Sequence, residues 1–340
     1  MRNPLSKTIE QIKPSGIRKF FDIVSEMPHA ISLGVGEPDF DTPWHVRSEG
    51  IRSLEKGRTF YTSNSGLIEL RQEICKWYQR KYNVLYDYKT EALLTVGGSE
   101  GIDVALRAML DPGDEVIIPE PCYVSYVPCV QLIGAVPVTI ELKNENQFRL
   151  TPEELLAAIT DKTKILILAY PSNPTGAVMT KEDLEPIAKI CQEKDIYVIS
   201  DEIYSELTYG GEKHCSISSL PGMKERTIVI NGFSKAYAMT GWRLGYALAP
   251  EVIAHQMTKI HQFAIMCAPT TSQYAAIEAI KNGDADIEKM CKSYDQRRRF
   301  LLKKFEEIGL PCFEPHGAFY VFPCIKEFGI TSDEFATRLL

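Results

Sequence analysis

Long hydrophobic runs are missing from this 340-residue sequence, and none approaches the roughly 18–20 residues that span a bilayer. The first sixteen residues lack the apolar stretch of a signal peptide. Positive charge is not in excess, because the formal net charge is -7, so neither nucleic acid nor an anionic membrane is expected as a partner. The nine cysteines show no C-x-x-C and no paired Cys/His spacing, which argues against a metal site or a disulfide scaffold. We therefore expect a reduced, cytoplasmic enzyme.

Short apolar stretches rich in β-branched residues predict seven strands. They are Leu93–Val96, Glu115–Ile118, Val136–Ile140, Ile165–Tyr170, Tyr197–Ser200, Thr227–Ile230 and Leu244–Ala249. Helical patterns lie between most of them, which predicts an α/β fold with a mostly parallel seven-stranded sheet flanked by helices. After Asp284 the alternation stops, and a long amphipathic helix is followed by a predicted strand over Ala318–Phe322. This change predicts a second, smaller α+β domain.

The chain is accordingly divided into three parts. Residues 1–15 are predicted to form an N-terminal arm, residues 46–284 the large cofactor-binding domain, and residues 16–45 with 285–340 the small domain. The last stretch, Thr331–Leu340, begins like a capped helix and stops with its apolar face still running. We therefore expect the small domain to be cut short at its C-terminal end.

The stretch Thr227–Ala249 carries the first chemical signal. Its first strand ends in a polar turn that delivers Lys235, and Arg243 follows eight residues later. A lysine amine of lowered pKa can form a Schiff base with an aldehyde, and a guanidinium offers a planar fork to phosphate oxygens. A lone lysine at a strand end more often only meets water, so this interpretation depends on other segments.

A glycine-rich turn follows the strand that begins at Leu93. Gly97–Gly98–Ser99–Glu100–Gly101 opens a helix, whose free amide groups suit a phosphate. The same letters match G-x-S-x-G, the nucleophile elbow of α/β-hydrolases, so a serine hydrolase with Ser99 as nucleophile is a rival hypothesis. No HGGG-type oxyanion loop and no evident Asp…His pair accompany it.

Three more segments place polar or aromatic side chains beyond strand ends, where open α/β sheets bind ligands. Asn173 stands between two prolines, and Asp201 comes directly after a strand with Tyr204 one helical turn further. Tyr123 could lay its ring over a flat cofactor. Taken alone, Asn173 is more often part of an ordinary Asn-Pro turn, Asp201 also suits a helix N-cap, and Tyr123 equally suits the core. With Lys235 they describe a site for pyridoxal 5'-phosphate.

The order and spacing of these motifs resemble the fold-type-I, class I/II aminotransferases, the aspartate aminotransferase family. The resemblance runs through GVGEPDF, YTSNSG, GGSEGI, YPSNPTG, SDEIYSEL, SKAYAMTGWRLGY and GAFYVF, along essentially the whole chain. SGIRKF, SDEIYSELTYG and TIVINGFSK resemble bacterial N-acetyl-diaminopimelate aminotransferases most, although aspartate and aromatic aminotransferases share most of these stretches.

The resemblance implies roles for individual residues. For the cofactor it implies Lys235 as Schiff-base lysine and proton shuttle, Asp201 at the ring nitrogen, Asn173 and Tyr204 at the ring oxygen, Tyr123 stacked on the ring, and Gly98, Ser99 and Arg243 at the phosphate. It also implies a homodimer with active sites at the interface, in which Tyr61 reaches the cofactor phosphate of the partner subunit. The residues implied to bind the substrate are Gly36, Asn173, Ile17 and Arg18.

The implied reaction is ping-pong transamination in amino-acid biosynthesis. An L-amino acid of N-acetyl-diaminopimelate, aspartate or aromatic type gives its amino group to a 2-oxo acid. Two features depart from the family: Gly232 replaces a frequent hydroxyl residue, and the family's substrate-carboxylate arginine would lie beyond residue 340. The sequence as given is therefore expected to bind amino acids poorly, and a carbon–sulfur lyase of the same fold or a cofactor-binding scaffold stays open.

Overall fold

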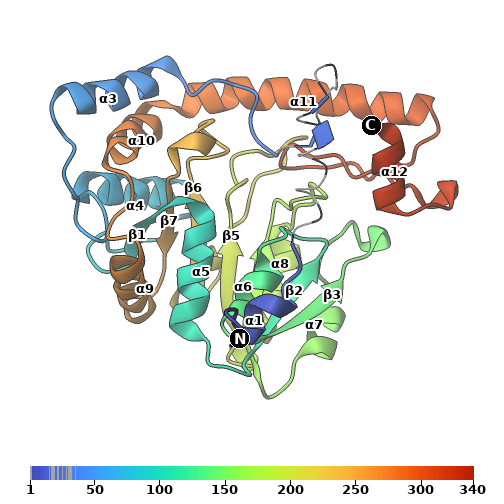
Figure 1. Cartoon of the computed structure of the whole chain (residues 1–340), viewed down its shortest axis with the longest axis horizontal. Helices are drawn as coiled ribbons and strands as arrows, with labels where there is room; N and C mark the ends of the chain where they lie inside the picture. The colour runs from blue at the N-terminus through green and yellow to red at the C-terminus, as the bar shows by residue number, and fades with distance from the viewer. Residues whose placement is uncertain are drawn as a thin grey trace.

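A seven-stranded sheet forms the centre of the protein, in the order β1-β7-β6-β5-β4-β2-β3 (Figure 1). The computed structural model describes residues 2–14, 16, 20, 23–24, 26–27, 29, 33–34 and 36–340. The strands are β1 (Ala92–Thr95), β2 (Glu115–Glu120), β3 (Val136–Glu141), β4 (Thr163–Ala169), β5 (Tyr197–Asp201), β6 (Thr227–Gly232) and β7 (Gly245–Leu248). Each coincides with a predicted strand to within two residues at either end, and the α/β fold class is confirmed.

The sheet is mostly parallel, as predicted, and its register defines one functional edge. Neighbours among β2 to β6 pair in parallel, whereas β7 runs antiparallel to β1 and β6. Ala169 of β4 lies beside Asp201 of β5, and Gly232 of β6 lies beside Gly245 of β7. The carboxyl ends of β4, β5 and β6 therefore meet the start of β7 at a single edge.

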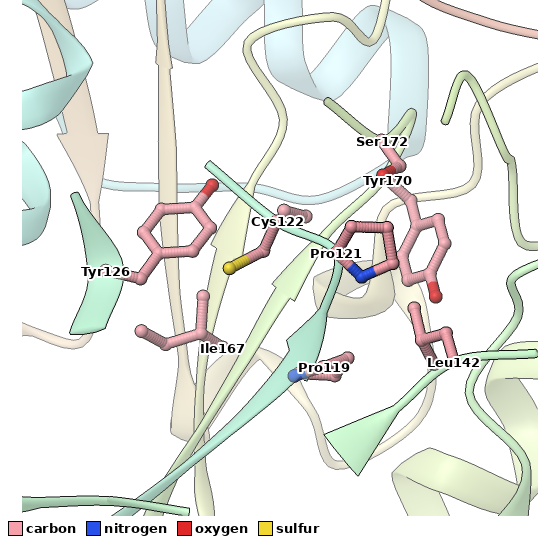
Figure 2. A pocket seen from close by; sticks show the side chains of 9 residues that line it. Pro119, Pro121, Cys122, Tyr126, Leu142, Ile167, Tyr170 and Ser172 are labelled. Atoms are coloured by element: carbon pink, nitrogen blue, oxygen red, sulfur yellow. The ribbon is translucent and has the colours of Figure 1, made fainter. Parts of the chain in front are cut away.

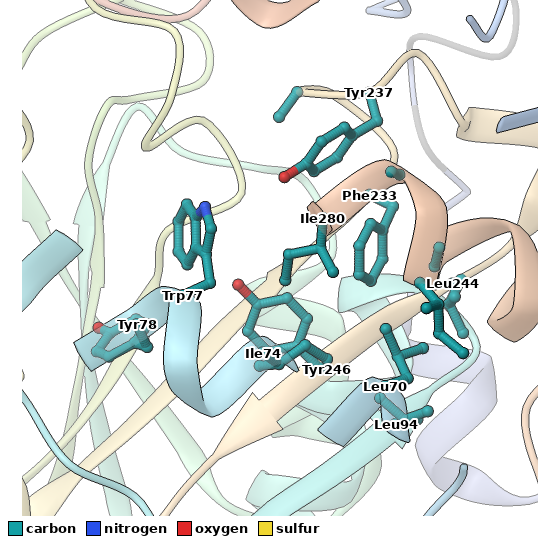
Figure 3. Packing of buried hydrophobic residues seen from close by; sticks show 14 of the residues in the cluster. Leu70, Ile74, Trp77, Tyr78, Leu94, Phe233, Tyr237, Leu244, Tyr246 and Ile280 are labelled. Carbon is teal, nitrogen blue, oxygen red and sulfur yellow. The ribbon is translucent and has the colours of Figure 1, made fainter. Parts of the chain in front are cut away.

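Helices cover both faces because the central strands are apolar on both sides. On one face α4 (Ile68–Tyr82) and α10 (Thr270–Asn282) bury a core with β1, β6 and β7 (Figure 3). The other face carries α5 (Gly97–Met109), α6 (Tyr126–Leu132) and α9 (Glu251–Ala264). Two further helices, α7 (Pro152–Ala158) and α8 (Lys181–Glu193), pack against each other beside β3 and β4, and Thr180 caps the start of α8.

The remaining helices of the described residues lie around this core. They are α1 (Lys7–Gln11), α3 (Trp44–Glu55), α11 (Asp284–Glu307) and α12 (Ser332–Leu339), with short 3-10 turns at Asn144–Asn146, Ile217–Ser219, Lys224–Arg226, Thr240–Trp242 and Lys326–Phe328. The α1 helix contacts α6, and α11 crosses one end of the molecule (Figure 1). Across the described ranges, no helix combines the length and apolar character that a membrane span requires.

The strand predicted over Ala318–Phe322 is wrong. Ala318 has a φ of 55° and forms a turn, and only the flanking residues make isolated bridges, Gly317 with Thr208 and Pro323 with Cys312. A strand needs a continuous neighbour for its backbone groups. Here the amide of Ala318 instead donates to the carbonyl of Leu207, so the turn docks on the segment after β5.

His45 joins three helices at one end of the molecule. Its Nδ1 lies 2.8 Å from Glu278 of α10 and its Nε2 lies 2.9 Å from Asp286 of α11. Partial burial lowers the pKa of His45, but the hydrogen bonds to Asp286 and Glu278 outweigh burial and raise the pKa above the ordinary value of 6.5. The charged imidazolium therefore stabilises the folded state.

We expect this stabilisation to depend on pH. It is complete below about pH 6.5, where the unfolded imidazole is also protonated, and it is lost as the pH rises through the raised native pKa. His45→Gln should lower Tm by about 1–2 °C near pH 6 and should leave Tm unchanged near pH 9. The effect is small because His45 and its two carboxylate partners are partly exposed. His255→Gln on the exposed side of α9 is the control; a Tm difference that does not change with pH would contradict the assignment.

Candidate active site

Lys235 follows β6 at the functional edge. Its Nζ donates to the carbonyl of Gly36 at 2.5 Å and lies 5.8 Å from the ring centroid of Tyr204 and 5.6 Å from that of Phe319. Burial lowers the pKa of Lys235 to about 8, and the positive charge of Arg243 acts in the same direction. A larger fraction of the amine is therefore neutral and nucleophilic near neutral pH than for an exposed lysine.

Asp201 ends β5, the strand next to β6. It is 9% exposed, its Oδ2 accepts the hydroxyl of Tyr126 at 2.8 Å, and its Oδ1 accepts the amide of Ile203 at 3.1 Å. Burial raises the pKa of Asp201, while the two hydrogen bonds and the charge of Lys235 favour the carboxylate. A buried carboxylate held in this way suits a cationic partner.

Tyr204 reaches the same region by a different route from the one predicted. Residues 203–206 form a turn rather than the first turn of a helix. The hydroxyl of Tyr204 lies 2.6 Å from that of Tyr320, and an added Cβ at Gly36 would lie 2.3 Å from the same Tyr320 hydroxyl. Tyr204, Tyr320, Gly36 and Lys235 are therefore close neighbours.

The amino end of α5 and Arg243 form the cationic end of the site. Gly97 has a φ of 76°, and an added Cβ there would lie 2.6 Å from Nη2 of Arg243. Arg243 is exposed, and its Nη1 donates to the carbonyl of Thr240 at 3.1 Å. Exposed Ser99 and half-buried Tyr123 face each other across 3.5 Å between hydroxyls. Free helix amides, a hydroxyl and a guanidinium are a donor set that fits a phosphate.

The departure at Gly232 has a steric reason. An added Cβ there would lie 2.9 Å from Cα of Gly245 and 3.0 Å from the carbonyl oxygen of Leu244. The backbone of β7 occupies the space in which a hydroxyl side chain would stand.

The other predicted site residues lie in loops or outside the described residues. Half-buried Asn173 lies in the loop after β4, and that loop is closed by two backbone hydrogen bonds of 2.9 Å, from the amide of Ser172 to the carbonyl of Ala177 and from the amide of Gly176 to the carbonyl of Ser172. Tyr61 is 81% exposed on the connection between α3 and α4. Ile17 and Arg18 lie outside the described residues.

A small pocket opens between the ends of β2 and β4 (Figure 2). It is lined by Pro119, Pro121, Cys122, Tyr126, Leu142, Ile167, Ala169, Tyr170 and Ser172. Burial raises the pKa of Cys122 to about 12, so its thiol is not a nucleophile at neutral pH. Since no lining side chain is charged, the pocket does not suit an amino-acid substrate; it borders the site through the Tyr126 ring.

The sequence did not assign Tyr126, Phe319 or Tyr320 to the site. Tyr126 begins α6 three residues after Tyr123, and no local sequence signal joins its hydroxyl to Asp201. Tyr320 and Phe319 belong to GAFYVF, a stretch that was noted but assigned to a strand.

Comparison with known proteins identifies the family. Residues 28–340 match the family described as aminotransferase class I and II. The chain belongs to this family. A Bacillus subtilis protein whose name specifies an aminotransferase but no substrate is 52% identical over 100% of this chain and 88% of its own length. The aspartate aminotransferase of Pyrococcus abyssi is 46% identical over 99% of this chain and 87% of its own length.

Other relatives differ in the substrates that their names give. A Bacillus subtilis protein named as an N-acetyl-LL-diaminopimelate aminotransferase is 42% identical over 100% of this class I/II chain and 86% of its own length. The crystal structure of the aromatic aminotransferase from Pyrococcus horikoshii superposes with a TM-score of 0.90 at 45% identity, covering 95% of this chain and 87% of that one.

This class I/II chain is thus a pyridoxal-phosphate-dependent aminotransferase. Its donor set fits that cofactor: a lysine of lowered pKa, a buried carboxylate and a cationic helix end lie at one sheet edge. Family membership does not favour the serine hydrolase or the carbon–sulfur lyase. Within the described part of the chain, the hydroxyl of Ser99 contacts that of Tyr123 and not a histidine.

Proposed function

We propose that this aminotransferase moves an amino group between an L-amino acid of aspartate, aromatic or N-acetyl-diaminopimelate type and a 2-oxo acid, as a step in amino-acid biosynthesis in the cytoplasm. The observation that carries the proposal is the amine of Lys235, with a pKa lowered to about 8, at the sheet edge that also presents Asp201. When bound, pyridoxal phosphate supplies the electron-withdrawing ring that makes the substrate Cα proton acidic.

Lys235 has two tasks in this proposal. With the cofactor bound, its amine would hold the cofactor aldehyde as a Schiff base, with loss of water, and the amine that the substrate sets free would carry the Cα proton. The contact with the Gly36 carbonyl at 2.5 Å and the neighbouring rings of Tyr204 and Phe319 restrict where the amine can move. Gly36 itself would contact the substrate carboxylate, and Ile17 and Arg18 would help to select the substrate side chain.

The other residues bind and orient the cofactor. Asp201 holds positive charge at the ring nitrogen, while Tyr204 and Asn173 hydrogen-bond the ring oxygen and Tyr123 stacks on the ring. Arg243, Ser99 and the amide of Gly98 at the start of α5 bind the phosphate. The three-part division into an arm, a large domain at 46–284 and a small domain at 16–45 and 285–340 remains part of the proposal.

We also propose that two copies of the chain form a homodimer. Exposed large apolar side chains gather on two adjoining segments: Phe60, Tyr61, Phe263, Ile265 and Met266. The segments lie together because Asn64 donates to the carbonyl of Met266 and Thr270 to that of Phe60, both at 2.8 Å. Such a patch favours a protein partner, and Tyr61 on it would reach the partner's phosphate. Sedimentation should give twice the chain mass of 38.3 kDa; a monomer mass would reject the dimer.

A screen of amino donors tests the substrate class. L-Aspartate, L-phenylalanine and N-acetyl-L,L-diaminopimelate are offered with 2-oxoglutarate as acceptor, and the 2-oxo acid formed from each donor is measured. L-Glutamate is offered with oxaloacetate instead, because with 2-oxoglutarate it would only regenerate the acceptor. We expect one of the aspartate, aromatic and N-acetyl-diaminopimelate donors to have a kcat/KM at least tenfold above that of each remaining donor. Tenfold corresponds to about 1.4 kcal/mol of transition-state stabilisation. Equal or absent turnover of all three would contradict the proposed class.

A further inference from the structure

Tyr320 stands directly behind Tyr204. Their hydroxyl oxygens are 2.6 Å apart and their rings meet edge to face at 5.7 Å. Among the residues that the structure describes, Tyr204 is the only hydrogen-bond partner found for the Tyr320 hydroxyl, and either oxygen can be the donor. The direction of this bond therefore depends on what else Tyr204 contacts.

The position of Tyr320 is fixed by backbone contacts of the residues that directly precede it in the chain. The amide of Ala318 donates to Leu207 and the amide of Gly317 donates to Gly176, both at 2.9 Å. The Tyr320 hydroxyl also lies so close to Gly36 that an added Cβ there would stand 2.3 Å from it. The hydroxyl is thus held against Tyr204.

Each tyrosine hydroxyl carries one proton, and this decides the direction of the hydrogen bond between Tyr204 and Tyr320 when the cofactor is bound. Burial raises the pKa of Tyr320 to about 12 and the pKa of Tyr204 well above its ordinary value, so both hydroxyls carry their proton at neutral pH. If the hydroxyl of Tyr204 donates its hydrogen bond to the cofactor's ring oxygen, the hydrogen bond between the two tyrosines must be donated by Tyr320. A hydroxyl that accepts a hydrogen bond becomes a stronger donor.

We propose that Tyr320 is a positioning residue that donates to Tyr204 and so aligns and strengthens the Tyr204 hydroxyl toward the ring oxygen of pyridoxal phosphate. This inference rests on the proposed role of Tyr204. Other titratable groups around the pair are Tyr123, Asp201 and Lys235, and they stay the same in every variant compared below.

The test is a set of four variants: Tyr204→Phe, Tyr320→Phe, the double variant and Tyr294→Phe. Tyr294 is the matched control because it packs on Phe319 at 5.4 Å in the same cluster, and its buried hydroxyl has no hydrogen-bond partner within the described part of the chain. The readouts are the pH midpoint of the visible absorption change of the lysine-bound cofactor and the Kd of the apoprotein for pyridoxal phosphate. Neither readout requires turnover.

A donor to the ring oxygen stabilises its negative charge, so losing it makes protonation of the lysine linkage easier and raises the midpoint. We expect Tyr204→Phe to raise the midpoint by about one pH unit, the effect of one hydrogen bond to a charged acceptor. Tyr320→Phe should raise it by roughly a quarter of that and weaken cofactor binding by roughly twofold, through cooperativity. Tyr294→Phe should change neither readout, and the double variant should equal Tyr204→Phe.

Each contrary outcome has a distinct meaning. If Tyr204→Phe leaves the midpoint unchanged, the proposed role of Tyr204 fails. If Tyr204→Phe raises the midpoint and Tyr320→Phe does not, the inference about Tyr320 is overturned. It is also overturned if Tyr320→Phe matches the Tyr294→Phe control, or if its effect persists in the Tyr204→Phe background.

Discussion

Lys235→Ala will abolish transamination and the visible absorption of the lysine-bound cofactor. The amine is the group that bonds to the aldehyde, and no other lysine contacts Gly36 or the Tyr204 and Phe319 rings among the described residues. Because the variant loses both the covalent bond and the proton carrier, kcat should fall by at least about 10⁴-fold. The rate of 2-oxo acid formation and the absorption spectrum measure the two losses separately.

Lys235→Arg is the matched control for charge. It keeps a cation near Asp201 and Glu37, whose charges act on Lys235, but a guanidinium does not form the covalent bond at neutral pH. We expect it to be as inactive as Lys235→Ala while still binding pyridoxal phosphate noncovalently. Transamination by either variant within tenfold of the wild-type rate would contradict the role of the lysine.

Asp201→Ala will lower kcat by at least about 100-fold and leave the fold intact. The carboxylate is the charged acceptor at the end of β5, and electrostatic groups of this kind contribute factors of this size. The substitution also removes the acceptor that lies 2.8 Å from the hydroxyl of Tyr126. Because this buried hydroxyl then has no partner, we expect a modest fall in Tm as well. Steady-state kinetics and thermal unfolding measure the two effects.

Asp201→Asn separates charge from shape. Asparagine can keep an Oδ1 that accepts from the amide of Ile203, and its Nδ2 can donate to the hydroxyl of Tyr126, but it has no negative charge. We therefore expect Asp201→Asn to recover the Tm of the wild type and not its kcat. An unchanged kcat in either variant would remove the electrostatic role of Asp201.

The sheet could be predicted from the sequence because its strands are buried on both faces. Continuous Ile, Val and Leu in β4, β5 and β6 leave few alternatives to a parallel core. Once the strands are placed, their carboxyl ends must share an edge, which brings Asp201, Lys235 and Arg243 toward one another without knowledge of their side-chain contacts.

Contacts made by chain segments far apart could not be predicted in the same way. Tyr320 meets Tyr204 across 116 positions, and the intervening turn at Ala318 forms because Leu207 and Gly176 accept its backbone amides. The local pattern of residues 318–322 favours a strand, but no neighbouring strand pairs with it in the described chain. The Tyr126 hydroxyl on Asp201 was missed for the same reason, since α6 reaches β5 only in the folded chain.

Borohydride reduction of the holoenzyme, followed by digestion and mass spectrometry, tests the central claim most directly. Reduction makes the bond between the cofactor and its lysine permanent. The account predicts a single peptide that carries the cofactor mass, with the modification on Lys235. The cofactor attached to another lysine, or released without attachment, would contradict it.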